Sequence, residues 1–266
     1  MSKVKCILID PPDIYQKQGA NQRTQMHEVY PPLGLLYIAA ILEQSGIDIR
    51  LIEARSRGLS PQEVVEIIEK ENPQFVAITA ITASINSALY LSAKVKEISP
   101  DIKVILGGPH IHFQHKTIID NPSVDFCVRD EGELTTLELI SSLLNGDNLA
   151  QVKGITFKQG NVVIAAPDRS FVEDLDELPF PARGLLHHPA YRGGWTGGRP
   201  FTSVLATRGC PYHCQFCASP AIWGRRHRRR SVANVLDELE EICQKFGVRY
   251  VRFVDDLLLV NKRWTI

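Results

Sequence analysis

Residues 207–217 read Thr-Arg-Gly-Cys-Pro-Tyr-His-Cys-Gln-Phe-Cys, and a β-branched run from Ser203 to Thr207 leads directly into them. Three thiolates spaced in this way in one loop can bind three irons of a cubane iron–sulfur cluster, whose fourth iron ordinarily takes another cysteine. No fourth cysteine lies nearby in the sequence. An iron without a protein ligand can chelate a small molecule, which makes the cluster catalytic. The loop therefore predicts a catalytic cluster bound by Cys210, Cys214 and Cys217.

A structural zinc site is the alternative interpretation of the same loop. Zinc sites usually close with four ligands, arranged in paired Cys-x2-Cys or Cys/His groups. Only His213 stands close enough in the sequence to add a fourth ligand. The spacing therefore favours the iron–sulfur cluster.

The residues after the cysteines predict a helix and a strand, which with the strand Ser203 to Thr207 make one strand–helix–strand unit. The helix is expected from its N-cap Ser231 to Phe246, with Gly247 ending it, and the strand from Val248 to Val254. The apolar stripe of this helix comprises Val232, Val235, Leu236, Leu239, Ile242, Cys243 and Phe246. A cysteine on such a stripe is expected to be a small buried hydrophobe.

Residues 1 to about 145 alternate short β-branched runs with helical patterns, which is typical of a parallel sheet flanked by helices. The fold class predicted here is α/β, a doubly wound, Rossmann-like parallel sheet. The expected strands are Cys6 to Ile9, Ile47 to Ile52, Phe75 to Thr79, Val104 to Leu106 and Asp125 to Val128. One helix should begin at the capping box Ser60-Pro61-Gln62-Glu63, and others should cover 35–44, 89–98 and 133–144. Cys6 and Cys127, on strands, are expected to be buried.

A hairpin and a linker separate the two α/β parts. Two strands, Ile155 to Phe157 and Val162 to Ala165, are expected around Gln159-Gly160-Asn161. From Ala166 to Pro200 proline, glycine and charged residues replace the periodic patterns. The aromatic residues of this segment favour packing over disorder, so we expect an ordered linker over the junction of the two parts.

Ligands of doubly wound sheets bind beyond the carboxyl ends of the strands, so the loops after the strands supply the candidate binding residues. These loops offer hydroxyls, carboxylates and a pair of glycines that would let a flat or bulky ligand approach the backbone. The candidates are Pro32, Leu33, Gly34, Thr79, Thr82, Gly107, Gly108, Pro109, Glu131, Gly132 and Glu133. A tight turn is the alternative interpretation of the glycine pair.

Together and in this order, these loops and the cysteine triad resemble the cobalamin (B12)-dependent radical S-adenosylmethionine (SAM) enzymes. This family contains the anaerobic Mg-protoporphyrin IX monomethyl ester cyclase and many C-methyltransferases. The resemblance covers essentially the whole chain, including residues 178–183, Leu-Pro-Phe-Pro-Ala-Arg. It implies three cofactors, namely a 4Fe-4S cluster, SAM and cobalamin.

The resemblance also implies a division of the chain. Residues 1–150 would form the cobalamin-binding domain, 151–200 the hairpin and linker, and 201–266 the N-terminal part of a radical SAM partial β/α barrel. A full barrel of eight units takes about 250 residues, and a six-unit barrel would also need far more than this segment supplies. We therefore expect an incomplete barrel, in a fragment or in a protein cut short after its second barrel strand.

Single residues take roles from the same resemblance. Cys210, Cys214 and Cys217 would hold the cluster, whose unique iron binds the amino and carboxylate groups of SAM, and reductive cleavage would yield a 5′-deoxyadenosyl radical. Phe216 would pack near the adenine. Asp255 or Asp256, after the second barrel strand, would receive the SAM amino group. A solvated strand end is the alternative interpretation for either aspartate.

The loop after the first strand departs from cobalamin domains of the methionine synthase type. Their Asp-x-His-x-x-Gly motif would here read Asp-Pro-Pro-Asp-Ile-Tyr from Asp10, so Pro12 stands where a cobalt-ligating histidine would be. Cobalamin is therefore expected to bind without an imidazole from this motif. His27, in the same loop, is a possible substitute, although a lone loop histidine is more often just exposed.

The hypotheses for function share these cofactors. The first is an enzyme that methylates an unactivated carbon of a small-molecule or natural-product substrate, with electrons from a donor such as flavodoxin or ferredoxin. The second is oxidative cyclisation or rearrangement of the Mg-protoporphyrin cyclase type. A third is a cofactor-binding fragment that is inactive alone. A methylthiotransferase acting on transfer RNA is disfavoured, because Cys6 and Cys127 cannot supply three ligands for a second cluster.

The composition argues against several other partners. Thirty basic and thirty acidic residues cancel, so neither nucleic acid nor an anionic membrane is an expected partner. The five arginines of residues 225–230 are expected to bind an anion locally or to be solvated. His110, His112 and His115 are expected to be structural. No segment reaches membrane-spanning length, and the cysteines form no secreted disulfide pattern, which favours the cytoplasm.

Overall fold

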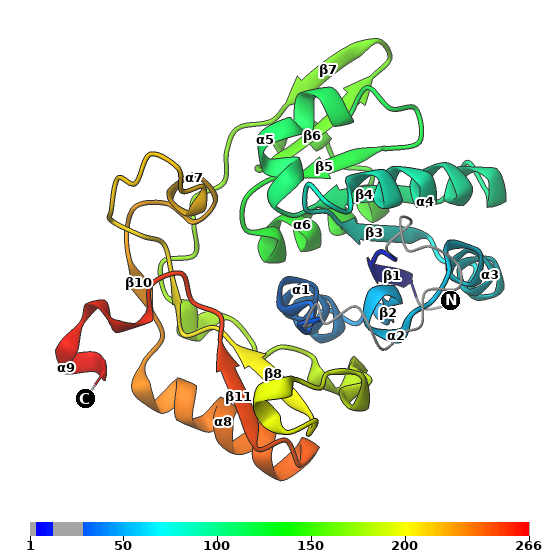
Figure 1. Ribbon diagram of the computed structural model, residues 1–266. Helices are drawn as coiled ribbons and strands as arrows, with labels where there is room; N and C mark the ends of the chain where they lie inside the picture. Colours follow the sequence, from blue (N-terminus) through cyan, green and yellow to red (C-terminus); the bar gives the residue numbers. More distant parts are fainter. Residues whose placement is uncertain (1–3, 13–28, 266) are drawn as a thin grey trace.

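A seven-stranded sheet organises the N-terminal half of the chain (Figure 1). The computed structural model describes residues 4–12 and 29–265, so His27 lies outside the described residues. The sheet has the order β2-β1-β3-β4-β5-β6-β7. Its strands are β1 (Lys5–Asp10), β2 (Asp48–Glu53), β3 (Phe75–Thr79), β4 (Lys103–Gly107), β5 (Phe126–Val128), β6 (Ile155–Gln159) and β7 (Val162–Ala165). Strands β1 to β5 are parallel, and the hairpin β6-β7 adds to the edge at β5 in antiparallel sense.

Helices cover both faces of this sheet, as the doubly wound prediction requires. They are α1 (Leu33–Gln44), α2 (Ala54–Arg57), α3 (Pro61–Glu71), α4 (Ile85–Ile98), α5 (Pro109–Ile118) and α6 (Gly132–Asn145). Alternate residues of β1 enter two cores: Cys6 and Leu8 join the core of α1 and α6, whereas Ile7 and Ile9 join that of α3 and α4. The alternation follows from the two-residue period of a strand. Both Cys6 and Cys127 are buried, as predicted.

The capping box predicted at the start of α3 is present. The Ser60 side chain accepts from the Glu63 amide at 3.2 Å, and the Glu63 carboxylate accepts from the Ser60 amide at 2.8 Å. Reciprocal capping satisfies two backbone donors that a helix start leaves unpaired. A purely local signal therefore placed this helix correctly.

The C-terminal part contains two short sheets. Its elements are β8 (Phe201–Val204), β9 (Thr207–Arg208), α7 (Ser219–Trp223), β10 (Arg228–Arg229), α8 (Val232–Phe246), β11 (Tyr250–Phe253) and α9 (Lys262–Thr265). Strands β8 and β11 are parallel, and β9 and β10 are antiparallel. The single strand predicted from Ser203 to Thr207 is therefore wrong. It breaks because the Asp255 carboxylate accepts hydrogen bonds from the amides of Ala206 and Thr207, at 3.0 and 2.5 Å.

Helix α8 begins at the predicted N-cap Ser231 but buries less of its apolar stripe than predicted. Val235 and Ile242 are buried, whereas Val232 and Leu236 are exposed. Cys243 is also exposed, so its predicted burial is wrong. The reason is that, among the described residues, the stripe faces only the small core at Val204 and Val248, which is too narrow to cover it.

The segment 166–200 is ordered and packs between the two parts, as predicted. Its buried side chains Leu175, Leu178, Leu186 and Tyr191 share one core with α1 and Phe201 of β8. The remaining short turns of 3-10 helix are η1 (Leu149–Gln151), η2 (Leu175–Glu177), η3 (Arg183–Leu185), η4 (His188–Ala190), η5 (Gly194–Thr196) and η6 (Leu258–Val260). Within 4–12 and 29–265, no helix combines the length and apolarity needed to cross a bilayer.

Candidate functional site

A cavity of about 400 Å³ opens at the carboxyl ends of β1, β3, β4 and β5. Its volume lies in the range of small-molecule sites. The wall contains eleven of the residues predicted from sequence: Pro32, Leu33, Gly34, Thr79, Gly107, Gly108, Pro109, Glu131, Gly132, Glu133 and Asp256. The opposite wall comes from the C-terminal part, with Thr207, Arg208 and Trp223. The fold thus brings the strand-end loops and the start of the cysteine loop to one space.

Six predicted residues are not part of this wall: Thr82, Phe216, Asp255 and the three cysteines of the triad. Thr82 instead contacts the His110 ring at 3.2 Å. Phe216 is 94% exposed. Cys214 and Cys217 are exposed, and Cys210 is partly buried, with its amide donating to the Gly224 carbonyl at 3.1 Å.

The cysteine loop itself has no regular structure from Gly209 to Ala218. Among the described residues no three His, Cys, Asp or Glu side chains are grouped so as to hold a metal ion. The three thiols of the triad are free. The Cys214 and Cys217 thiols are therefore accessible to solvent, and the Cys210 thiol is partly so.

Gly108 has a backbone requirement that agrees with the alternative interpretation of the glycine pair as a tight turn. Its φ of 99° and ψ of 177° lie in a region that essentially only glycine adopts. A Cβ there would lie 2.8 Å from Thr79 Oγ1 and 2.9 Å from the Ala80 carbonyl oxygen. Position 108 therefore requires glycine because the backbone there packs closely against Thr79 and Ala80 after β3. Thr79 is itself part of the cavity wall.

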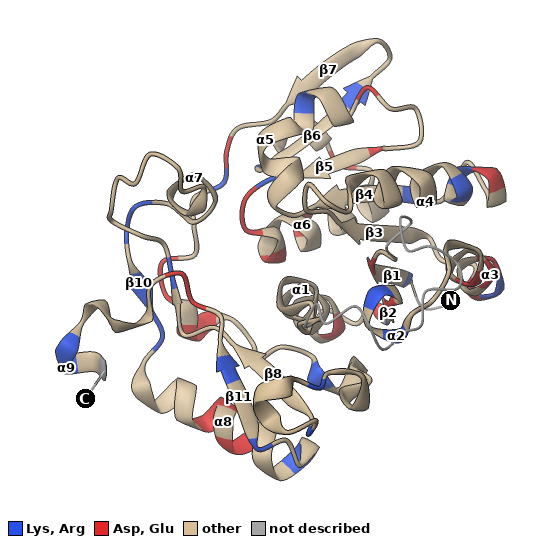
Figure 2. Ribbon diagram, in the orientation of Figure 1, with Lys and Arg blue, Asp and Glu red and all other residues tan. Residues whose placement is uncertain are grey.

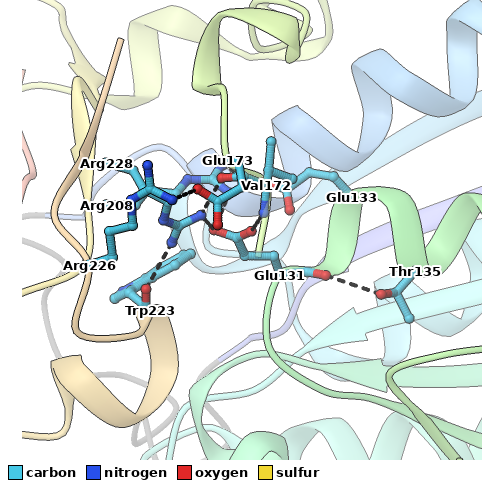
Figure 3. Close-up of polar contacts among 9 residues, drawn as sticks. All are labelled: Glu131, Glu133, Thr135, Val172, Glu173, Arg208, Trp223, Arg226 and Arg228. Atoms are coloured by element: carbon cyan, nitrogen blue, oxygen red, sulfur yellow. Dashed lines mark hydrogen bonds and ion pairs between the residues drawn. The ribbon is translucent and has the colours of Figure 1, made fainter. Parts of the chain in front are cut away.

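Glu131 and Glu133 line the cavity, but their carboxylates are paired with arginines of the C-terminal part (Figure 3). Arg208 lies 2.5 Å from Glu133 and 3.1 Å from Glu131, and Arg228 lies 2.7 Å from Glu131. All four side chains are at least 95% buried. The nearby glutamates keep the pKa of Arg208 above its usual range, although burial opposes this. These residues form a buried ionic cluster between the two parts.

Two arginines of the run, Arg228 and Arg230, are neither solvated nor free to bind an anion, because both are buried and paired with glutamates. Arg230 pairs with the buried Glu238, which also contacts Arg183 at 2.6 Å. Arg225, Arg226 and Arg229 are exposed, and Arg226 pairs with Glu173 at the surface. Figure 2 shows the wider pattern, with basic and acidic segments interspersed over both parts. The roles of Arg228 and Arg230 depend on ion pairs with residues distant in the chain. A single sequence does not show such pairs.

The two aspartates after β11 have different environments. Asp255 Oδ1 accepts three hydrogen bonds, from the amides of Ala206 and Thr207 and from Thr207 Oγ1. Burial raises the pKa of Asp255, and these hydrogen bonds oppose the rise. Asp256 accepts from Ser219 Oγ at 2.5 Å and lines the cavity. Of the two, Asp256 is the one placed to meet a ligand in the cavity.

The three histidines of α5 make protein contacts. Besides the contact of His110 with Thr82, the His115 ring lies 2.8 Å from Thr156 Oγ1. His112 Nδ1 lies 2.7 Å from an Asp130 oxygen, and both of these residues line the cavity. Asp130 has a φ of 56°, which is uncommon for a residue other than glycine. The contacts of His110 and His115 agree with structural roles, whereas His112 also lines the cavity.

Asp10 is a cavity residue that sequence reasoning missed. It ends β1 beside Glu53 of β2, and its side chain is 93% buried. Burial raises the pKa of Asp10 to about 6, helped by the negative charge of Glu53 and opposed by Arg55, whose Nε lies 3.7 Å away. A carboxylate at the end of an apolar strand in a doubly wound sheet was the signal available in the sequence.

The Asp10→Asn variant is expected to be more stable than the wild type above pH 6 and similar to it near pH 4. The pKa of Asp10 in the folded protein lies above its unfolded value of about 3.9, so the folded protein binds a proton at Asp10 more tightly than the unfolded chain does. The stabilisation that this bound proton gives the wild type is lost as pH rises through 6. Removing the charge should stabilise the protein by up to about 3 kcal/mol at pH 8. Urea unfolding at pH 4 and pH 8 measures this, and an equal effect at both pH values would contradict it.

Two family models match the chain in succession. The B12 binding domain model matches residues 24–140. The Radical SAM superfamily model matches residues 204–263. Thr79, Gly108 and Glu131 of the cavity wall belong to the first match, and Thr207, Arg208 and Asp256 belong to the second. The cavity therefore lies where the two matched segments meet.

Curated proteins resemble the chain along most of its length. It is 33% identical over 267 residues to an uncharacterized methyltransferase of Pyrococcus horikoshii, covering 100% of this chain and 56% of that protein. It is 30% identical over 249 residues to the anaerobic magnesium-protoporphyrin IX monomethyl ester cyclase of Synechocystis sp., covering 88% of this chain and 47% of the cyclase. The chain thus spans about half the length of these curated relatives.

Solved structures confirm the fold. The radical SAM methyltransferase TsrM from Kitasatospora setae, solved with cobalamin and a [4Fe-4S] cluster, superposes with a TM-score of 0.73 at 17% identity, covering 96% of this chain and 49% of TsrM. The enzyme OxsB, solved with aqua-cobalamin and SAM, gives a TM-score of 0.77 at 18% identity, covering 96% of this chain and 34% of OxsB. Both carry the same succession of α/β parts.

Proposed function

Because this chain belongs to the cobalamin-dependent radical SAM enzymes, we propose that it binds cobalamin, SAM and a 4Fe-4S cluster for the methylation of an unactivated carbon. One observation carries the proposal: a single cavity is walled both by the strand-end loops of the B12-binding match and by the start of the radical SAM match. Cofactors that must exchange a group or an electron need such a shared space. When bound, they would supply radical formation from SAM and a methyl carrier.

The cobalamin would take the cavity at the ends of β3 and β4. Residues 1–150 would form its domain, with 151–200 as hairpin and linker. Backbone at Gly107–Pro109 and Pro32–Gly34 and the Thr79 hydroxyl line the space that would receive it. The wall is largely apolar, with a few polar groups, which suits a large ligand with amide edges. Glu131 and Glu133, on either side of Gly132, would support the wall through their ion pairs with Arg208.

The cluster and SAM would be held by residues 201–266. Cys210, Cys214 and Cys217 fit a cluster by their donor chemistry, since soft thiolates are the ligands that iron–sulfur clusters take. All three thiols are free. Phe216 is exposed beside them and would cover the adenine. Asp256 would receive the SAM amino group, because Asp255 already accepts three hydrogen bonds from β9 and its preceding residue.

The cellular setting follows from the same chemistry. Six free cysteines suit a reducing compartment, so we place the protein in the cytoplasm. Reduction of the cluster would come from a donor such as flavodoxin or ferredoxin. Thirty basic and thirty acidic residues cancel, which supports a small-molecule or natural-product substrate over nucleic acid.

Oxidative cyclisation is the second candidate function. The relative from Synechocystis sp. is an anaerobic magnesium-protoporphyrin IX monomethyl ester cyclase, and its 30% identity over 88% of this chain is comparable to that of the methyltransferase relative. Methylation is preferred because methyltransferases recur among the relatives, including hopanoid C-3 methylase at 29% identity. A cofactor-binding segment that is inactive alone is the third candidate, since the chain spans about half of these relatives.

Anaerobic reconstitution with iron, sulfide and hydroxocobalamin tests the proposal. The protein is expected to retain about four irons and about one cobalamin after gel filtration, and to release 5′-deoxyadenosine from SAM on reduction. Methyl-labelled SAM should leave label in the corrinoid fraction. Formation of 5′-deoxyadenosine without such label would favour cyclisation. Bound cofactors without SAM cleavage would favour the inactive segment, and failure to bind either cofactor would refute the proposal.

A further inference from the structure

The buried ionic cluster of Arg208, Arg228, Glu131 and Glu133 spans the junction of the two parts (Figure 3). We call it the Arg208 cluster. Arg208 contacts both glutamates, and Arg228 contacts Glu131. The second oxygen of Glu131 accepts from the Val172 amide of the linker at 2.7 Å. Every charged side chain in it therefore has a partner of opposite sign, and two glutamates balance two arginines.

Aromatic rings and backbone carbonyls restrain the two arginines further. The Arg208 guanidinium lies between the Tyr37 and Trp223 rings, 5.3 and 5.2 Å from their centroids. Arg228 donates to the Trp223 carbonyl at 2.8 Å and to the Val172 carbonyl at 2.7 Å. Buried arginines held by carboxylates, rings and carbonyls at once have little freedom to move independently.

The Arg208 cluster joins two functional segments. On one side, Glu131 and Glu133 stand at the start of α6 and line the cavity. On the other side, Arg208 ends β9 two residues before Cys210, and Arg228 belongs to its partner strand β10. The Cys210 amide is in turn held by the Gly224 carbonyl, next to Trp223. Arg208 therefore connects the two glutamates of the cavity wall to the first cysteine of the triad.

We infer that Arg208 is a positioning residue that couples occupancy of the cavity to the cysteine loop. A cobalamin packed against the Glu131–Glu133 wall would fix Arg208, and Arg208 would hold Cys210 in place for the cluster. This inference rests on the proposed function. Coupling between two sites is reciprocal, so an iron–sulfur cluster in the loop must tighten cobalamin binding by the same factor.

Equilibrium dialysis of hydroxocobalamin against the full chain, with and without the cluster, measures this coupling. The wild type is expected to bind cobalamin several-fold more tightly when the cluster is present, within the usual range of about 5- to 150-fold for coupled sites. Arg208→Lys keeps the charge but loses the planar fork that reaches both glutamates. We expect this variant to assemble the cluster while the ratio of the two dissociation constants falls to about one.

Arg226→Lys, between α7 and β10, is the matched control. Arg226 also pairs with a glutamate, Glu173, but the two side chains are 75% and 63% exposed. Its ratio of dissociation constants should equal that of the wild type. The reduced-cluster electron paramagnetic resonance spectrum adds a second readout: it should change on cobalamin addition in the wild type and in Arg226→Lys, and stay unchanged in Arg208→Lys.

A second variant keeps the inference testable if Arg208→Lys does not fold. Glu133→Gln is isosteric and leaves Glu131 paired with both arginines, so it removes only the negative charge that Arg208 meets at position 133. The ratio of its cobalamin dissociation constants without and with the cluster should also fall below the wild-type ratio. Equal coupling in the wild type and in the folded Arg208→Lys or Glu133→Gln proteins would overturn the inference while both cofactors still bind. Failure of the wild type to bind iron or cobalamin would overturn the proposed function and this inference with it.

Discussion

Replacing Cys214 by alanine is expected to leave the anaerobically reconstituted protein with almost no iron. A three-cysteine site has no spare thiolate, since one iron already lacks a protein ligand, so losing Cys214 leaves two adjacent irons without one. The nearby His213 does not replace it, because its ring contacts Arg225 at 2.6 Å. Iron content should fall from about four per chain to less than about one, together with the broad visible absorbance of the cluster. Cys210→Ala and Cys217→Ala should behave alike.

Cys243→Ala is the control for this loss. Cys243 is a free, exposed thiol like Cys214, but it lies on α8 outside the cysteine loop. Iron content in this variant should equal that of the wild type. If Cys214→Ala retained its full iron content, or if Cys243→Ala lost as much iron as Cys214→Ala, the assignment of the triad would be wrong.

Gly108→Ala is expected to destabilise the protein by about 3 kcal/mol or more and to weaken cobalamin binding. An alanine in this region of φ and ψ carries strain of about 1 to 3 kcal/mol. Its Cβ would also overlap Thr79 Oγ1 and the Ala80 backbone, at 2.8 to 3.0 Å, and relieving the overlap must shift the loop after β3. Because that loop lines the cavity, the loss of stability and of binding should occur together.

Gly160→Ala separates backbone strain from overlap. Gly160, in the turn between β6 and β7, has a φ of 61°, and a Cβ there would meet nothing within 4 Å. This variant should lose only about 1 to 2 kcal/mol and should bind cobalamin normally. Urea unfolding and cobalamin titration of both variants give the comparison. Equal losses of stability in the two variants would mean that the contact with Thr79 is not what requires glycine at position 108.

Local patterns predicted much of this fold because they act within a few residues. The capping box at Ser60, the N-cap at Ser231 and the strand from Cys6 to Ile9 each depend on neighbours in sequence, and the structure confirms all three. The strand-end rule gathered Thr79, Gly108 and Glu131 at one cavity, since the carboxyl ends of parallel strands share one edge of a sheet.

Long-range partners explain the errors and omissions. Cys243 is exposed because the core beside α8 is narrow, although the helix itself is amphipathic. The strand before the cysteines breaks at Ala206 because its amide donates a hydrogen bond to Asp255, 49 residues further along the chain. A helical stripe or a β-branched run indicates which side chains a segment could bury or pair. It does not indicate which other segments the fold brings next to them.

By itself the sequence determined the α/β class, the doubly wound sheet, the cysteine triad and the residues at the strand ends, because period, capping and motif spacing are local properties. Only the tertiary structure decided which charges neutralise one another. Glu131 lies 97 residues from Arg228 in the chain, yet their side chains meet at 2.7 Å in the interior. Buried charges require partners of opposite sign, and which residues can reach each other there depends on how the two parts of the chain pack.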